Sequence, residues 1–371
     1  MLKPHGLATL LLAALGCMPC THAQAQILVG QTTGVTGPVA AAVKETGIGA
    51  RLYIDATNAK GGVGGEKIEL VTLDDKFDPK LSATNARTLL EERKVVALFM
   101  TRGTPHTEAV IPILEQYGVP LVAPSTGAMV LHAPVRKYVF NVRATYQREA
   151  EKAIAHLASI GIQRIAILHV DDSFGRDGLE GAQKGLAAAH LGAALVAKFD
   201  RSTPDFSTIA PQLSQAQTQA AMIIGTGPAV VAGIRAIKAG GSKMQFVTLS
   251  NNASDGFMQL LGADAAGVIV SQVFPNSLNF PLVREATRLA KVQNITELSP
   301  AMLEGFASAK VLVEALRRSG SKPNRERIQA ALEGMQNFDL GGMAINYSPG
   351  NHTGLDFADL SIVGASLKFR R

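Results

Sequence analysis

The chain has little of what several classes of protein need. Tryptophan is absent, and aromatic residues make up only 5% of the 371 residues, so the base-stacking surfaces of single-strand nucleic-acid binders are not expected. Only two cysteines occur, Cys17 and Cys20, and both lie in the first 25 residues. Residues 26–371 therefore have no thiol for a disulfide or a cysteine metal site, and must fold around a hydrophobic core.

The first 25 residues have the features of a cleaved export signal. Lys3 precedes the apolar run Leu7–Leu15, and Ala23-Gln24-Ala25 has the small residues that signal peptidase prefers. We expect cleavage after Ala25 and release into the periplasm. A membrane anchor is the alternative, but the apolar run is far shorter than the ~20 residues that cross a bilayer. Lipidation of Cys17 is a further alternative. The preferred lipidation pattern has a large aliphatic residue followed by a small one, and that order is reversed here.

Charge of one sign is not concentrated anywhere in the chain. The net charge is +6, with 47% apolar and 18% charged residues, which is typical of a globular α/β protein. Basic residues are scattered apart from short groups such as Arg317-Arg318, and we interpret these as solvated surface rather than as a patch for nucleic acid. After the signal, no run is apolar enough to span a membrane.

Short β-branched runs alternate with helical stretches, which indicates parallel sheets covered by helices. The first series starts at Ile27 and ends near Val142, and a second series starts near Gln147. The remaining tail is mostly helical, with strands expected only at Ala344–Tyr347 and Leu360–Val363. We therefore predict a first lobe of residues 26–146 and 275–350, and a second lobe of residues 147–274 and 351–371. The tail is expected to pack on the first lobe, and its final strands are expected to complete existing sheets.

Three loops of the first half are rich in hydroxyl groups and glycine at the points where strands lead into helices. They are Gln31–Pro38, Thr101–Thr107 and Pro124–Gly127. Ligands of parallel sheets collect at this edge, and hydroxyl groups with free backbone N–H groups can hold an anion such as a carboxylate. Helix capping and turn formation explain each loop equally well when it is taken alone.

No set of residues for catalysis or for a metal is evident. The chain has no G-x-S-x-G elbow, and Asp74-Asp75 and Asp171-Asp172 have no His or Cys at ligand spacing, so loop capping is the favoured role. Gly61–Gly65 follows a helix and precedes a strand, the reverse of a dinucleotide-binding turn. We expect neither cofactor nor metal, and we do not expect an enzyme.

Several short segments, in order, resemble one family over nearly the whole of residues 26–371. They are Thr36-Gly37-Pro38, Asn58–Val63, Asp74-Asp75 with Asp78-Pro79-Lys80, Gly118-Val119-Pro120, Ala123-Pro124-Ser125, Ser173-Phe174-Gly175 and Asp205-Phe206-Ser207. Together they resemble the type I periplasmic solute-binding proteins of ABC importers, in the leucine/isoleucine/valine-binding branch. The resemblance implies two doubly wound α/β lobes, joined by a three-crossover hinge, that close on a ligand and present it to a membrane permease.

The resemblance also implies binding residues. Thr104 matches the hydroxyl that meets a ligand carboxylate, and Ser125, Thr126 and Gly127 match the stretch that holds the carboxylate and the amino group. From the second lobe, Phe174 matches an aromatic residue that closes over the ligand. Thr226 or Gly227 occupies the place of another aromatic residue of the family. The second-lobe wall of the cleft is therefore smaller or differently shaped here.

One departure leaves the ligand class open. Amino-acid binders of this branch have an acid after the strand that here ends at Leu249, whereas this chain has Ser250, Asn251 and Asn252. A buried ammonium group without a countercharge is costly, and Asp255 is displaced by about one helical turn. Because the family transports amino acids, the resemblance implies a branched-chain amino acid as the ligand. A carboxylate or amide without an ammonium group, such as an aromatic acid, is the alternative.

The expected function is a periplasmic receptor, monomeric, that delivers a small solute to an ABC permease. A dinucleotide-dependent enzyme is an alternative suggested by the doubly wound halves, and a ligand-sensing receptor of the same fold is another. The reversed order of glycine turn and strand argues against the enzyme. The sensor would need a membrane or DNA-binding segment, or a separate partner, to transmit its signal.

Overall fold

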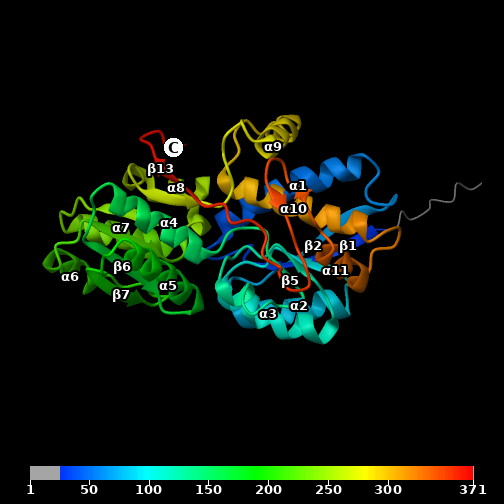
Figure 1. The fold of residues 1–371 in the computed structure, drawn as a ribbon, viewed down its shortest axis with the longest axis horizontal. Coiled ribbons are helices and arrows are strands. Elements are labelled where there is room, and N and C mark those ends of the chain that lie inside the picture. The colour runs from blue at the N-terminus through cyan, green and yellow to red at the C-terminus, as the bar shows by residue number, and fades with distance from the viewer. Residues whose placement is uncertain (1–25, 371) are drawn as a thin grey trace, which may run out of the picture.

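The computed structural model describes residues 26–370, which form two lobes side by side along the long axis (Figure 1). The expected cleavage site after Ala25 borders this range, and the expected signal lies outside the described residues. The first lobe is built on a five-stranded parallel sheet in the order β2-β1-β3-β4-β5. Its strands are β1 (Gln26–Thr33), β2 (Lys67–Asp74), β3 (Ala97–Phe99), β4 (Leu121–Val122) and β5 (Val139–Phe140).

Helices cover both faces of this sheet. In Figure 1, α1 and α10 lie above it and α2 and α3 lie below it; buried apolar residues fill both interfaces. The helices of this lobe are α1 (Ala40–Ala59), α2 (Pro79–Glu91), α3 (Thr104–Tyr117), α9 (Pro281–Val292), α10 (Pro300–Arg318) and α11 (Arg325–Glu333). The α1 and α10 backbones touch at two glycines, because a Cβ on Gly49 would lie 1.8 Å from the Met302 carbonyl oxygen, and one on Gly305 would lie 1.9 Å from the Thr46 carbonyl oxygen.

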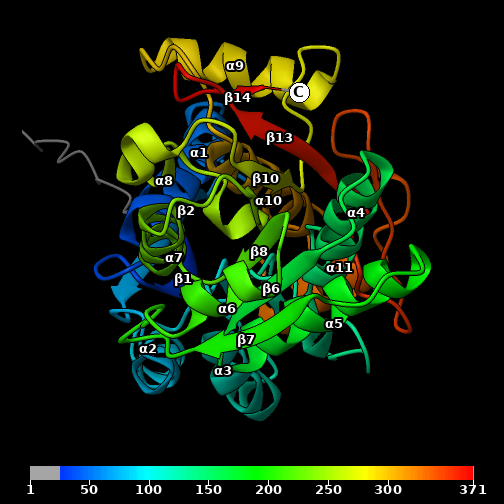
Figure 2. The same cartoon turned by 90° about the vertical axis from the view of Figure 1, so that its left-hand side faces the viewer.

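The second lobe has a seven-stranded sheet in the order β14-β13-β10-β9-β8-β6-β7 (Figure 2). The strands are β6 (Ile165–Val170), β7 (Leu195–Phe199), β8 (Ala220–Ile224), β9 (Gln245–Thr248), β10 (Ile269–Gln272), β13 (Asp359–Val363) and β14 (Phe369–Arg370). Five of them are parallel, while β13 and β14 extend one edge in antiparallel fashion.

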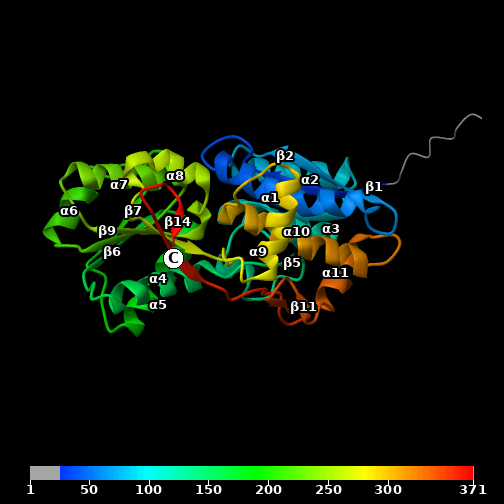
Figure 3. The ribbon, with the colours of Figure 1, turned by 90° about the horizontal axis from the view of Figure 1, so that it is seen from above.

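The helices of the second lobe also cover both faces of their sheet. They are α4 (Tyr146–Ser159), α5 (Ser173–Ala188), α6 (Ile209–Gln215), α7 (Gly227–Ala239) and α8 (Asp255–Leu261). Seen from above, α4 and α5 lie on one side and α6 and α7 on the other (Figure 3). Several helices have side-chain caps that the sequence shows, such as Asp172 before α5 and Thr145 before α4.

The chain passes between the two sheets three times. The connections run from β5 to α4, from β10 to α9, and from the tail ribbon to β13. The predicted fold class, two doubly wound α/β lobes with three crossovers, is confirmed. No helix within residues 26–370 has both the length and the apolar character that a bilayer crossing needs.

One expectation about the tail was wrong. The strand expected at Ala344–Tyr347 does not complete an existing sheet. Instead, β12 (Ala344–Ile345) pairs only with β11 (Phe338–Asp339), as a separate two-stranded ribbon. The turn between them explains this local pairing, because Gly341 and Gly342 both have positive φ and Asp339 accepts hydrogen bonds from both of their N–H groups. Leu360–Val363 does join a sheet, as β13.

Candidate functional site

A small space lies between the lobes, beyond the carboxyl ends of the strands of both sheets. We call it the inner cavity, and its volume is about 20 Å³. It is lined by Val39, Phe77, Arg102, Gly103, Thr104, Ser125, Tyr146, Phe174, Arg201, Thr226 and Asn251. Each of these residues follows a strand of one of the two sheets. This is the edge at which parallel sheets bind ligands.

A groove opens from the inner cavity along the lobe boundary and has a volume of about 320 Å³. The two spaces share four lining residues, Val39, Arg102, Thr226 and Asn251. The outer groove, as we call it, lies between the start of α1 in the first lobe and the α7 and α8 region of the second lobe.

The structure brings five of the nine residues expected from the sequence to the inner cavity: Thr104, Ser125, Phe174, Thr226 and Asn251. Gly227 and Asn252 line the outer groove instead. Thr126 and Gly127 line neither space. The first five come from five different loops, so only the folded arrangement makes them neighbours.

Thr126 and Gly127 support the wall rather than form it. The Thr126 and Thr104 hydroxyl oxygens lie 2.8 Å apart and share a hydrogen bond, so Thr126 orients the hydroxyl that lines the cavity. Gly127 packs against the first crossover, since a Cβ there would lie 2.5 Å from the Ala144 carbonyl oxygen. Its carbonyl accepts a hydrogen bond from the Tyr146 N–H group.

Arg102 lines both spaces and was not among the expected site residues. Its side chain is buried, with 5% exposure, and it donates one hydrogen bond to the Ser125 hydroxyl (3.0 Å) and one to the Asn251 carbonyl (2.7 Å) across the lobe boundary. Burial lowers the pKa of its guanidinium group, which stays protonated at neutral pH. No ion pair to a carboxylate is formed by Arg102 in the described part of the chain.

Three aromatic side chains form the apolar wall of the inner cavity. Tyr146 and Phe174 pack against each other with ring centroids 4.8 Å apart. Phe77 stacks on His106 at 4.0 Å, and the Arg201 guanidinium lies 5.1 Å from the centroid of the Phe77 ring. Burial lowers the pKa of His106 to about 4, so this histidine is neutral at neutral pH and adds no charge to the wall.

The two asparagines after β9 have different positions. Asn252 is buried and its amide donates to the Gly225 carbonyl (3.1 Å) and the Thr248 hydroxyl (2.9 Å), so it fixes the loop. Asn251 also donates to the Gly225 carbonyl, at 2.9 Å, but its Oδ1 atom has no hydrogen-bond partner within residues 26–370. Asn251, which lines both spaces, thus has a buried neutral acceptor without a partner among the described residues.

Asp255 does not line the inner cavity. It is the first residue of α8, whose N-terminus packs on α1, and its N–H group donates to Glu45 at 3.0 Å. Its side chain lines a separate hollow with Glu297 and Lys368. Burial raises the pKa of this carboxyl group. No Asp or Glu lines the inner cavity in the part of the chain that the structure describes.

The acidic pairs noted in the sequence cap loops. Asp74 accepts hydrogen bonds from the Thr36 N–H and hydroxyl groups and from the Lys76 N–H group. Asp172 caps α5 and pairs with Arg201, a residue of the cavity wall. The charge of Arg201 is therefore already balanced, whereas that of Arg102 has no direct carboxylate partner.

Comparisons with known proteins agree with this architecture. Residues 26–357 match the model of a family described as periplasmic binding protein. The chain belongs to the periplasmic binding protein family. Its resemblance to the leucine/isoleucine/valine-binding branch is confirmed, and it is a solute-binding protein.

Two curated relatives and one solved structure illustrate the similarity. Leu/Ile/Val-binding protein homolog 3 of Brucella melitensis is 25% identical over 333 residues, and Leu/Ile/Val-binding protein BraC3 of Rhizobium johnstonii is 27% identical over 345 residues; each match covers 88% of both chains. A substrate-binding periplasmic protein from Ralstonia solanacearum is 30% identical, with a TM-score of 0.84 over 93% of this chain and 99% of that chain.

Behind the cleft, this periplasmic binding protein has a buried charge network at the crossovers. Arg143, in the first crossover, forms ion pairs with Glu149 of α4 and, at 3.6 Å, with Glu304 of α10. Glu149 also accepts hydrogen bonds from the Ser250 N–H group at 2.9 Å and from the Ser271 hydroxyl. Glu304 in turn accepts from the Ser125 hydroxyl at 2.9 Å, so the network ends at the cavity wall.

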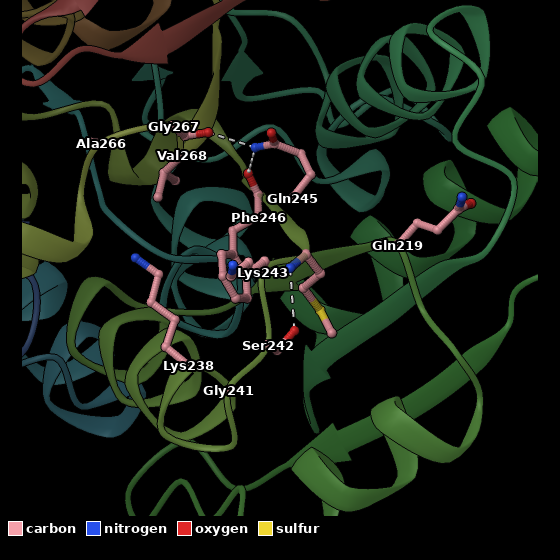
Figure 4. Close-up of a pocket in the computed structure, with 11 residues that line it drawn as sticks. Gln219, Lys238, Gly241, Ser242, Lys243, Gln245, Phe246, Ala266, Gly267 and Val268 are labelled. Atoms are coloured by element: carbon pink, nitrogen blue, oxygen red, sulfur yellow. Dashed lines mark hydrogen bonds between the residues drawn. The ribbon is translucent and has the colours of Figure 1, made fainter.

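The binding protein has a larger hollow, of about 690 Å³, elsewhere on the second lobe (Figure 4). Its residues precede or begin strands, as Gln219 does for β8 and Gln245 for β9, so it lies at the amino ends of the sheet. Gln245 lines this hollow, and its side-chain amide donates hydrogen bonds to the Phe246 and Gly267 carbonyls. Lys238 is held by Asp264. Ligands of parallel sheets bind at the opposite edge, so we assign the solute to the cleft.

Proposed function

We propose that this periplasmic binding protein is the solute-binding component of an ABC importer, and that it carries a small carboxylate without an ammonium group. The observation that carries the proposal is Arg102. A buried guanidinium group that touches only a hydroxyl and a carbonyl has donors left for a ligand, and guanidinium groups match carboxylates in shape and charge. Helices α3, α5 and α7 also have their N-termini at the cavity. Their dipoles favour an anion there.

In this proposal the ligand carboxylate lies among Arg102, Thr104 and Ser125. The hydroxyl groups have limited freedom, because Ser125 is held between Arg102 and Glu304, and Thr104 is held by Thr126. Such a preorganised site costs little conformational entropy on binding. The aromatic side chains Tyr146, Phe174 and Phe77 line the same cavity and shield the carboxylate end of the ligand from water.

The second part of the proposal is that no ammonium group is bound. Near the cavity, Asn251 offers a neutral oxygen where a carboxylate would be needed, and Asp255 lies in another hollow. Transfer of an ammonium group into a site without a countercharge is strongly unfavourable. A hydroxyl group on the ligand could donate to Asn251 Oδ1 without that cost.

A branched-chain α-amino acid is the second candidate ligand. It is favoured by the curated relatives, which are named as Leu/Ile/Val-binding proteins. Leucine has the same carboxylate and the same branched chain as isocaproate, from which it differs by one amino group. The two compounds therefore separate the candidates.

We expect isocaproate to bind about tenfold or more tightly than leucine in calorimetric titrations, since only leucine must bury an ammonium group. Isopentylamine, which has the ammonium group and no carboxylate, is expected not to bind and serves as the control. Tighter binding of leucine would contradict the proposal and favour the amino-acid candidate.

The remaining roles follow from the same proposal. The protein acts in the periplasm after removal of its export signal, as a monomer, and its partner is an inner-membrane permease. Its work is conformational: the ligand contacts residues of both lobes and so favours the closed arrangement by its differential affinity. No cofactor takes part.

A further inference from the structure

The two connected spaces of the cleft differ greatly in size. The inner cavity, of about 20 Å³, has room for about one water molecule, which needs ~10–15 Å³ on the same scale. The outer groove, of about 320 Å³, reaches the ~300 Å³ at which small-molecule pockets begin. In this closed arrangement, the body of a ligand fits only in the outer groove, while Arg102 lies where the two spaces meet.

The walls of the outer groove are apolar and nearly free of charge. Pro38 and Ala40–Ala42 form the first-lobe side, and Pro228, Phe257 and Leu260 form the second-lobe side. Arg102 is the only charged residue among those lining it within the described chain. Two of its polar residues are occupied locally: the Asn252 amide fixes the loop, and the Ser254 hydroxyl caps α8.

The outer groove runs from the interior of the protein to its surface. It starts at Arg102, which is buried, and it extends to Leu260, whose side chain is 43% exposed. A ligand with its charged end at Arg102 would therefore have its other end near solvent. Because the two walls belong to different lobes, such a tail would touch both and add to the free energy that favours closure.

We infer that the outer groove is a subsite for the tail of the ligand, and that the solute is a monocarboxylate with an extended, uncharged, apolar chain. This inference rests on the proposed function, since the carboxylate at Arg102 sets the position from which the tail starts. The tail lies along the first turn of α1 and ends beside Leu260. A branched side chain as short as that of leucine would leave the outer part of the groove unfilled.

The test is a series of unbranched carboxylates from butanoate to octanoate, titrated into the full-length mature protein by calorimetry. Burial of each added methylene is expected to raise the affinity about threefold to fourfold, until the tail reaches the solvent. A flat series in which the short acids bind overturns the tail subsite and leaves the proposed function intact. Absence of binding by every acid overturns both.

Two variants locate the effect in the groove. Ala41→Phe is expected to fill the groove, so that the affinity no longer rises with chain length. Leu260→Ala is a milder change, expected to reduce the gain from the last methylenes only. Leu278→Ala removes a leucine that is 60% exposed and lies outside the groove, and is the matched control. An unchanged series in both Ala41→Phe and Leu260→Ala would contradict the assignment.

Discussion

Arg102 has an environment that distinguishes it from the other buried arginine, Arg143. Arg143 contacts two carboxylates directly. Arg102 donates to the Ser125 hydroxyl and to a backbone carbonyl. Its link to the Glu304 carboxylate is indirect, through the Ser125 hydroxyl. Burial of a charge without direct pairing is costly. In the proposed binding mode, the carboxylate of the ligand offsets this cost.

Replacement of Arg102 should therefore affect binding more than folding. For Arg102→Gln we expect an affinity for isocaproate that is lower by about tenfold to a hundredfold, the loss typical of one or two charge-assisted hydrogen bonds. The melting temperature of the ligand-free protein should change little. Arg102→Lys keeps the charge but loses the planar pair of donors, so its affinity should lie between those of the wild type and Arg102→Gln. Calorimetry measures the affinity, and thermal melts measure the melting temperature. An unchanged affinity in Arg102→Gln would rule out a role of Arg102 in carboxylate binding.

The sequence could predict some of the cavity residues and not others, for physical reasons. Thr104, Ser125 and Asn251 stand in loops after strands, and strand ends of a parallel sheet converge. Arg102 stands in one of the same loops, and a charged residue among hydroxyl groups and glycine was a usable signal. Tyr146 begins a helix of the second lobe, and its place in the cavity depends on the angle between the lobes, which no local pattern encodes.

The crossovers are connected by side chains as well as by the backbone. Arg143 lies in the first crossover, Ser271 lies at the end of β10 just before the second, and Glu149 bonds to both. Glu304 ties α10 to the same group. Removal of one partner of a buried ion pair leaves the other charge uncompensated, so the hinge should be sensitive to a single change here.

Glu149→Gln tests this point. We expect the free energy of unfolding to fall by about 3–5 kcal/mol, because the Arg143 guanidinium loses its closest carboxylate inside the protein. Asp171→Asn, which breaks an exposed pair with Lys198, is the control and should have little effect. Urea denaturation of the three proteins gives the comparison, and equal midpoints for the wild type and Glu149→Gln would refute it.

Local sequence patterns predicted the helices and strands well where periodicity is strong. Helix α2 is an example, because its cap Asp78 and its first residue Pro79 are both start signals that the sequence shows. The tail strand at Ala344–Tyr347 was misassigned to a sheet because its partner is decided by the turn at Gly341 and Gly342. The short strands β4 and β5 have two residues each, and they depend on their neighbours in the sheet.

The two lobes are already in contact in this arrangement. Arg102 reaches the Asn251 carbonyl, Ser173 donates to Glu108, and the Met129 N–H group donates to Asp177. These contacts join the first lobe directly to the second. A ligand shifts the balance between open and closed forms only through contacts that it makes better in the closed form. In the binding mode proposed above, the carboxylate at Arg102 and the tail in the outer groove would both meet this condition.

The central claim is that a carboxylate is the recognised group. Isocaproate and its amide, isocaproamide, have the same chain and nearly the same shape, and differ in charge. Calorimetric titration of both into the wild-type protein is the most direct test. We predict that the acid binds about tenfold to a hundredfold more tightly than the amide, because only the acid pairs with the Arg102 guanidinium. Equal affinities, or tighter binding of the amide, would contradict the account.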